Sequence, residues 1–144
     1  MTADPGPDEV LVVETHEGRY TQEVRVGRHV WTVDEPVAAG GDDAGPGPYD
    51  LLKAAVGSCV SITLRLYADR KGWPVETIGV VVGHEKVTVT VDDRPTRRDR
   101  FSVDLSFTGE LSDEQRARLV EIAERCPVHR TLAHGAAFET RLAG

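Results

Sequence analysis

The sequence has little cysteine, few aromatic residues and no excess of positive charge. Only two cysteines, Cys59 and Cys126, occur among its 144 residues, and aromatic residues make up 6% of the chain. The formal net charge is −7, so the chain lacks the basic surface that nucleic-acid phosphates and anionic membranes attract. We therefore expect neither a nucleic-acid partner nor a membrane partner.

Long apolar runs and a signal peptide are also missing. No uninterrupted apolar run reaches the roughly 20 residues of a transmembrane helix. The first ten residues, MTADPGPDEV, lack the basic and apolar regions of a secretory signal. We expect a cytoplasmic protein, in which permanent disulfides are rare. Two cysteines in such a protein are free core thiols, metal ligands or redox groups.

The composition is that of a globular protein, with 40% hydrophobic and 28% charged residues. A chain of this length is sufficient for one domain with a hydrophobic core. We predict that residues 1–8 are disordered and that residues 9–144 form a single domain.

The first third of the chain has strand patterns. Residues 9–16 predict a first strand, and residues 19–36 predict a hairpin. Gly27-Arg28 fits a two-residue turn of type II′, which needs glycine in its first central position. Residues 37–48 are rich in glycine and proline and predict a loop.

A helix is predicted from about Pro48 to Lys71, with Gly72 as its stop. Two neighbouring apolar stripes follow helical spacing. One stripe contains Leu51, Ala55, Cys59, Ile62 and Leu66, and the other contains Leu52, Val56, Val60 and Leu64. A helix with apolar residues on most sides is expected to be buried on most sides.

The remaining residues alternate between strand and helix patterns. Residues 75–91 are strand-like, but the apolar alternation changes face near Gly83-His84, which predicts a bulge or a turn. We expect further elements in the order of a charged loop at 92–100, a strand at 101–107, a helix at 111–126 with a capping box at Ser112 and Gln115, and a strand at 136–142. The predicted fold class is α+β.

Three interpretations of the cysteines are open from the residues themselves. Both lie on apolar stripes, so they can be core side chains. A reactive thiolate would require a nearby cation, which the strand with Arg19 and Arg25 can supply to Cys59. Alternatively, Cys126 and His129 have the spacing of metal ligands, and Cys59 or His84 would have to complete the set.

Three segments resemble the OsmC/Ohr family, named for osmotically inducible and organic hydroperoxide resistance proteins. These segments are DEP (34–36), GPGPYDLLKAAVGSCVSITLRLYADRKGWPVE (45–76) and IAERCPVHRTL (122–132). The resemblance implies an intertwined homodimer, with the long central helix packed between sheets and the active sites at the subunit interface. That arrangement would cover a helix with two apolar stripes.

The resemblance also implies a mechanism. In the peroxidase members, a cysteine of the central helix attacks an organic hydroperoxide, and a second cysteine resolves the sulfenic acid to a disulfide, which a thiol or a lipoylated protein reduces. Cys59 matches the first cysteine and Cys126 the second. The family also pairs a glutamate at the start of the central helix with an arginine, and the glutamate position is Tyr49 here.

The arginine position aligns with Thr21, between Arg19 and Arg25, so either arginine is a candidate to hold the Cys59 thiolate. Tyr49 can donate a hydrogen bond to a thiolate or peroxide oxygen, or pack at the interface. Two functions follow. The first is a dithiol peroxidase for apolar organic hydroperoxides, and the second is a non-peroxidase protein that binds an apolar small molecule or a thiol. Neither a cofactor nor a metal is predicted.

Overall fold

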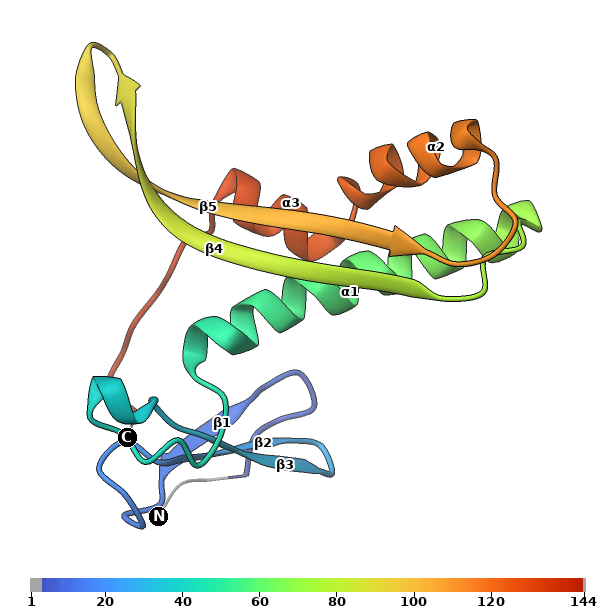
Figure 1. Cartoon of the computed structure of the whole chain (residues 1–144). Helices are drawn as coiled ribbons and strands as arrows, with labels where there is room; N and C mark the ends of the chain where they lie inside the picture. Colours follow the sequence, from blue (N-terminus) through green and yellow to red (C-terminus); the bar gives the residue numbers. More distant parts are fainter. Residues whose placement is uncertain (1–3, 144) are drawn as a thin grey trace. The chain divides into compact units, whose positions relative to one another are not determined.

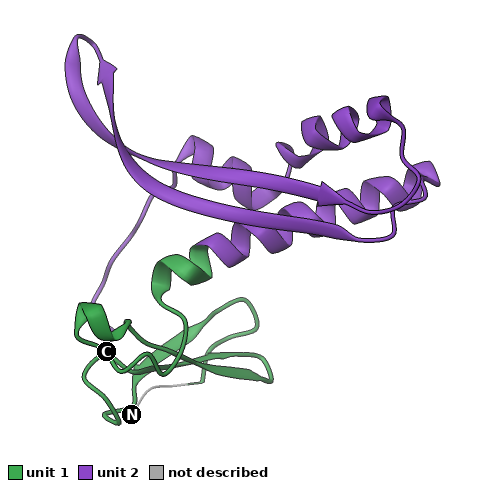
Figure 2. Cartoon of the chain, viewed as in Figure 1, with its two compact units in different colours: residues 1–52 green, residues 53–144 purple. Residues whose placement is uncertain are grey.

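The computed structural model describes residues 4–143, arranged as two compact units, residues 1–52 and 53–144 (Figures 1 and 2). The predicted disorder of residues 1–8 stays a prediction, and residues 1–3 lie outside the described residues.

The first unit contains a three-stranded antiparallel sheet in the order β1-β2-β3. Its strands are β1 (Leu11–Glu14), β2 (Gln22–Val26) and β3 (His29–Val33). The register pairs Val26 with His29, so Gly27 and Arg28 form the two-residue turn that the sequence predicts. Gly27 has a φ of 53°, which a residue without a Cβ adopts at little cost. A short 3₁₀ helix, Val37–Ala39, lies in the predicted loop.

Helix α1 (Pro48–Lys71) has the predicted bounds. Gly72 has a φ of 67°, its N–H donates to the carbonyl of Asp69, and the N–H of Trp73 donates to Ala68. These two bonds form a Schellman motif, which ends a helix on glycine.

Only one of the two apolar stripes of α1 is buried in the chain. Its buried residues are Val56, Val60, Leu64 and Ala68. On the other stripe, Ile62 and Leu66 are each 61% exposed. One chain therefore leaves the second stripe open, and the expectation that a second copy covers it stays a prediction. The helix is long and apolar enough to cross a membrane by length and composition alone, but its buried stripe lies in the core, as in the central helix of a globular domain.

Two long strands, β4 (Ile78–Val91) and β5 (Arg94–Phe107), form an antiparallel hairpin beside α1 (Figure 1). The predicted bulge or turn at Gly83-His84 is wrong, because the pairing runs without a break from Ile78↔Phe107 to Val91↔Arg94. The predicted charged loop at 92–100 is also wrong. Only Asp92 and Asp93 form the turn, with φ values of 50° and 61°, the signature of a type I′ turn.

The apolar pattern changes face because the hairpin extends beyond the end of the core. Ile78, Val80 and Val82 pack against the core cluster. Beyond Gly83 the valines Val87 and Val89 lie on the opposite face of the same unbroken strand, since side chains alternate with period two.

The second unit ends in helices. Helix α2 (Asp113–Ala123) begins with the predicted capping box between Ser112 and Gln115. The predicted helix to residue 126 is too long, because α2 ends at Ala123 and a further helix, α3 (Pro127–His134), follows. The predicted strand at 136–142 is wrong as well, because these residues form neither strand nor helix and are exposed.

The core of this unit lies between α1, the hairpin and α2. Its buried members include Val60, Leu64, Leu119, Ile122 and Cys126. The observed order of strands, long helix, strands and helices confirms the α+β class.

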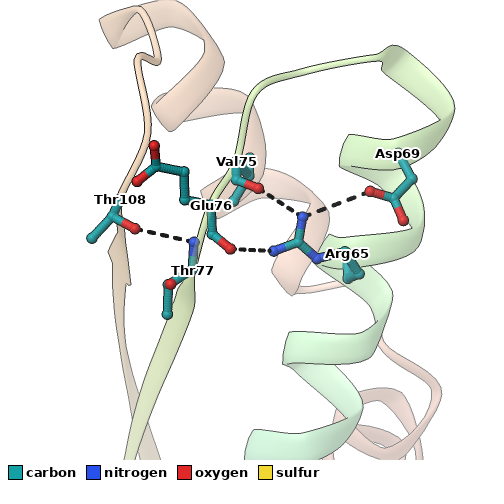
Figure 3. Close-up of polar contacts among 6 residues, drawn as sticks. All are labelled: Arg65, Asp69, Val75, Glu76, Thr77 and Thr108. Carbon is teal, nitrogen blue, oxygen red and sulfur yellow. Dashed lines mark hydrogen bonds and ion pairs between the residues drawn. The ribbon is translucent and has the colours of Figure 1, made fainter.

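Arg65 ties α1 to the start of β4 (Figure 3). Its guanidinium donates to the carbonyls of Val75 at 2.8 Å and Glu76 at 3.0 Å, and lies 3.6 Å from the Asp69 carboxylate. The N–H of Thr77 next donates to the Thr108 hydroxyl at 3.1 Å, which closes the open end of the hairpin. Together these bonds fix where the hairpin leaves the helix.

Candidate functional site

The two cysteines occupy different helical positions in the second unit. Cys59 lies in the middle of α1 and is partly exposed. Cys126 lies between α2 and α3. It is the N-cap of α3, and Pro127 is the first residue of that helix. Both thiols are free.

Cys126 is fully buried, with 0% of its surface exposed. Its Sγ accepts a hydrogen bond from the backbone N–H of His129, 3.3 Å away. Burial raises the pKa of the Cys126 thiol, the neighbouring Cys59 thiol raises it further, and the N–H groups of His129 and Val128 partly oppose the increase. Cys126 is therefore a protonated thiol at neutral pH.

Cys59 and Cys126 come together although they are far apart in the sequence. The Cys59 thiol lies near enough to the Cys126 thiol to raise its pKa. Cys59 also packs against the same core cluster in which Cys126 is buried. This unit therefore contains a pair of neighbouring free thiols, one partly exposed and one buried.

A pocket of about 230 Å³ lies within the second unit. Its lining includes Val60, the residue after Cys59, and His129, whose N–H binds Cys126. Apolar residues of β5 and α2 complete most of the wall, namely Phe101, Val103, Leu105 and Val120. No sequence pattern predicts this pocket, because its wall comes from four separate elements.

The two candidate arginines lie in the first unit. Arg25 of β2 makes an ion pair with Glu23 on the same face of the strand. The Arg19 guanidinium lies over the ring of Tyr20, 5.3 Å from its centroid. Tyr49 stands in the first turn of α1 and is 50% exposed. The roles given to these three residues stay predictions.

Asp34, the first residue of the DEP segment, is a buried carboxylate for which the sequence predicts no separate role. It accepts hydrogen bonds from the backbone N–H groups of Glu35 at 2.8 Å, and of Asp42 and Ala44, each at 3.1 Å. Burial opposes ionisation, but these N–H groups and the Thr21 side chain outweigh it and lower the pKa of Asp34. Asp34 therefore holds the loop before α1 as a structural anion.

The structure brings no metal-ligand set together in residues 4–143, where no group of three or more His, Cys, Asp or Glu side chains converges. The contact between Cys126 and His129 uses the backbone N–H of His129. His84 lies on β4, where its ring contacts the Asp99 carboxylate at 2.8 Å. The spacing of Cys126 and His129 therefore reflects a helix cap.

Comparison with known proteins gives a family and a fold. The sequence pattern of the family described as OsmC-like protein matches residues 40–141. No curated protein matches the chain in sequence. The chain is similar in structure to the OsmC-like protein of Mycoplasma pneumoniae, with a TM-score of 0.69 and 19% identity over 91% of this chain and 89% of that one.

Two further solved structures are of proteins named for a biological role. An organic hydroperoxide resistance protein of Legionella pneumophila gives a TM-score of 0.59 and 17% identity, covering 85% of this chain and 86% of that one. The organic hydroperoxide resistance protein OhrB of Bacillus subtilis gives a TM-score of 0.55 and 17% identity, covering 85% and 87%. At these identities the likeness shows a shared fold.

Proposed function

Because the chain belongs to the family of OsmC-like proteins, we propose that it reduces organic hydroperoxides through a dithiol–disulfide cycle of Cys59 and Cys126. The observation that carries the proposal is the convergence of these two free thiols in one unit of the fold. Structural relatives named for organic hydroperoxide resistance support the same reaction.

The burial difference supports separate roles for the two thiols. Cys59 is partly exposed, so it is the one that a hydroperoxide can reach. Its thiolate attacks the peroxide, the O–O bond breaks, Cys59 becomes a sulfenic acid, and the alkoxide takes a proton and leaves as an alcohol. Cys126 keeps its proton at neutral pH because burial raises its pKa, which suits a thiol that waits for the sulfenic acid.

Resolution then forms the disulfide. The Cys126 sulfur attacks the sulfenic sulfur of Cys59, and the hydroxyl leaves as water with the thiol proton. A thiol or lipoylated-protein reductant returns both cysteines to the thiol state. The close partner protects Cys59 from oxidation to sulfinic acid, which is irreversible for most proteins.

Activation of Cys59 requires a cation, and the sequence offers Arg19 and Arg25. Of the two candidate arginines, Arg25 already shares its charge with Glu23. Arg19 contacts the face of Tyr20, a weaker interaction for a cation. We therefore favour Arg19 over Arg25 as the cation that stabilises the thiolate, with Tyr49 as a hydrogen-bond donor to the thiolate or to a peroxide oxygen.

A homodimer belongs to this proposal. The exposed stripe of α1 includes Ile62 and Leu66 in the same helix as Cys59. A second copy that packs on this stripe would cover it and place apolar side chains near Cys59. An apolar peroxide would gain about 25 cal/mol for each Å² buried there, which hydrogen peroxide cannot match.

A second function is favoured by one departure from the family pattern. Tyr49 stands where the peroxidase members have a glutamate. With the pocket of about 230 Å³, this supports a non-peroxidase protein that binds an apolar small molecule or a thiol. In that case the apolar wall formed by Val103, Leu105 and Val120 would hold the ligand, and neither cysteine would react.

Consumption of cumene hydroperoxide with dithiothreitol or a lipoyl reductant separates the two functions. The parent protein should consume it faster than it consumes hydrogen peroxide, and Cys59→Ser should be inactive. Arg19→Met should slow the reaction more than Arg25→Met, and Tyr49→Phe tests the hydrogen bond with little change of shape. Equal rates for the parent and Cys59→Ser would favour the binding protein.

A further inference from the structure

The two sulfurs differ in their access to a molecule in solution. Cys126 is 0% exposed, whereas Cys59 is partly exposed. Exchange between a thiol and a disulfide is an attack by a thiolate on one of the two sulfurs, and access helps to decide which sulfur is attacked. A reductant therefore meets Cys59 first.

The two sulfurs also differ in what stabilises a negative charge on them. The Sγ of Cys126 caps α3 and accepts the His129 N–H at 3.3 Å. A helix N-terminus favours an anion, and its first N–H groups have no partner inside the helix. Cys59 lies in the interior of α1, where the neighbouring N–H groups bond within the helix. The N–H groups of His129 and Val128 partly offset the increase that burial causes in the pKa of Cys126, so an expelled Cys126 thiolate has a hydrogen-bond donor already in place.

From these two asymmetries we infer that reduction of the disulfide has a fixed direction, in which the reductant attacks Cys59 and expels Cys126. The inference rests on the proposed dithiol cycle and adds to it the route by which the cycle is reset. Its partner is a small or flexible dithiol that can bring one sulfur to the partly exposed face of Cys59.

The step balances as an exchange of disulfide bonds. The thiolate of the reductant forms a bond to the Cys59 sulfur, the Cys59–Cys126 bond breaks, and its electron pair goes to Cys126. The Cys126 thiolate accepts the His129 N–H and later takes a proton. The second thiol of the reductant then attacks the reductant sulfur bound to Cys59, forms the oxidised dithiol and releases the Cys59 thiolate.

The direction can be measured on the full-length parent protein. Diamide, which oxidises thiols without a peroxide, forms the disulfide, and a short reaction with excess glutathione is stopped by acid and then by N-ethylmaleimide. Trypsin separates the cysteines into the peptides Ala54–Arg65 and Cys126–Arg130. We expect glutathione on the first peptide and maleimide on the second.

The leaving-group contribution is tested at His129. His129→Pro removes the N–H that binds Cys126, in the first turn of α3 where proline is tolerated. His129→Ala keeps that N–H and removes only the imidazole, so it is the matched control. Loss of this N–H removes a group that lowers the pKa of Cys126, so exchange should slow, by about threefold, because a leaving thiol with a higher pKa departs more slowly. The control should slow the exchange less than His129→Pro does.

The outcomes separate this inference from the proposed function. Glutathione on Cys126, or equally on both cysteines, would overturn the inference, and so would a protein in which diamide forms no disulfide between them. If the protein shows the expected labelling but does not consume cumene hydroperoxide, the direction of disulfide reduction is supported and the proposed peroxidase function is refuted. Equal slowing by His129→Pro and His129→Ala would remove the N–H as the cause.

Discussion

Replacing Ile62 by alanine should weaken a homodimer without unfolding the chain. Ile62 lies on the α1 stripe that the chain leaves open, and it is 61% exposed. Burying a whole isoleucine side chain contributes about 1.5–3 kcal/mol, so covering the exposed part contributes about 1–2 kcal/mol in each copy. A two-fold interface uses the residue twice.

The expected loss is therefore about 2–4 kcal/mol for each dimer. Since about 1.4 kcal/mol changes a dissociation constant tenfold, Ile62→Ala should raise it about 30- to 700-fold. Light scattering and sedimentation over a dilution series measure this. The parent should give about twice the 15.7 kDa mass of one chain, and Ile62→Ala should fall to one chain at much higher concentration.

Val37→Ala is the matched control, because Val37 is also an exposed apolar residue, at 70%, but lies in the 3₁₀ helix of the first unit. It should leave the association nearly unchanged. A parent protein that is monomeric at micromolar concentration would refute the reasoning. So would a series in which Val37→Ala weakens the dimer and Ile62→Ala does not.

Three further predictions concern stability. Leu64 is 0% exposed in the core, so Leu64→Ala should lower the free energy of unfolding in urea by about 2–5 kcal/mol, and an effect below about 1 kcal/mol would show that the stripe is not buried. Arg65→Met removes two hydrogen bonds to backbone carbonyls and should cost about 1–3 kcal/mol by the same measurement, more than Arg70→Met at the exposed end of α1. The pKa of Asp34 is lowered from 3.8, so its contribution is present above that value and is lost as the pH falls through the folded pKa. The parent should therefore exceed Asp34→Asn in stability at pH 7, and this advantage should shrink as the pH is lowered below 3.8. A difference that stays constant as the pH falls would contradict the assignment.

The central helix could be predicted from the sequence because its signals are local. Proline is favoured at the first helical position, and glycine at the position after the last, where φ is positive. Both signals are present, at Pro48 and Gly72, and the helix ends where they place it. The capping box at Ser112 and the glycine turn at Gly27 were predicted for the same reason.

Errors arose where the outcome depended on distant partners. The alternation that changes face near Gly83 predicts a bulge if the strand must stay on one core. The pairing of Gly83 with Ser102 shows instead an unbroken strand that continues past the end of the core. The charged residues after Asp93 form a strand because the long partner strand β4 supplies their hydrogen bonds.

The site itself divides in the same way. The sequence contained both cysteines and the family resemblance that assigns them to a redox pair, because these are carried by residue identity and order. Only the tertiary structure decided which stripe of α1 is buried, that Cys126 caps α3, and that its thiol is buried beside Cys59. Burial and the environment of a thiol depend on side chains brought together from separate elements, and no local pattern encodes them.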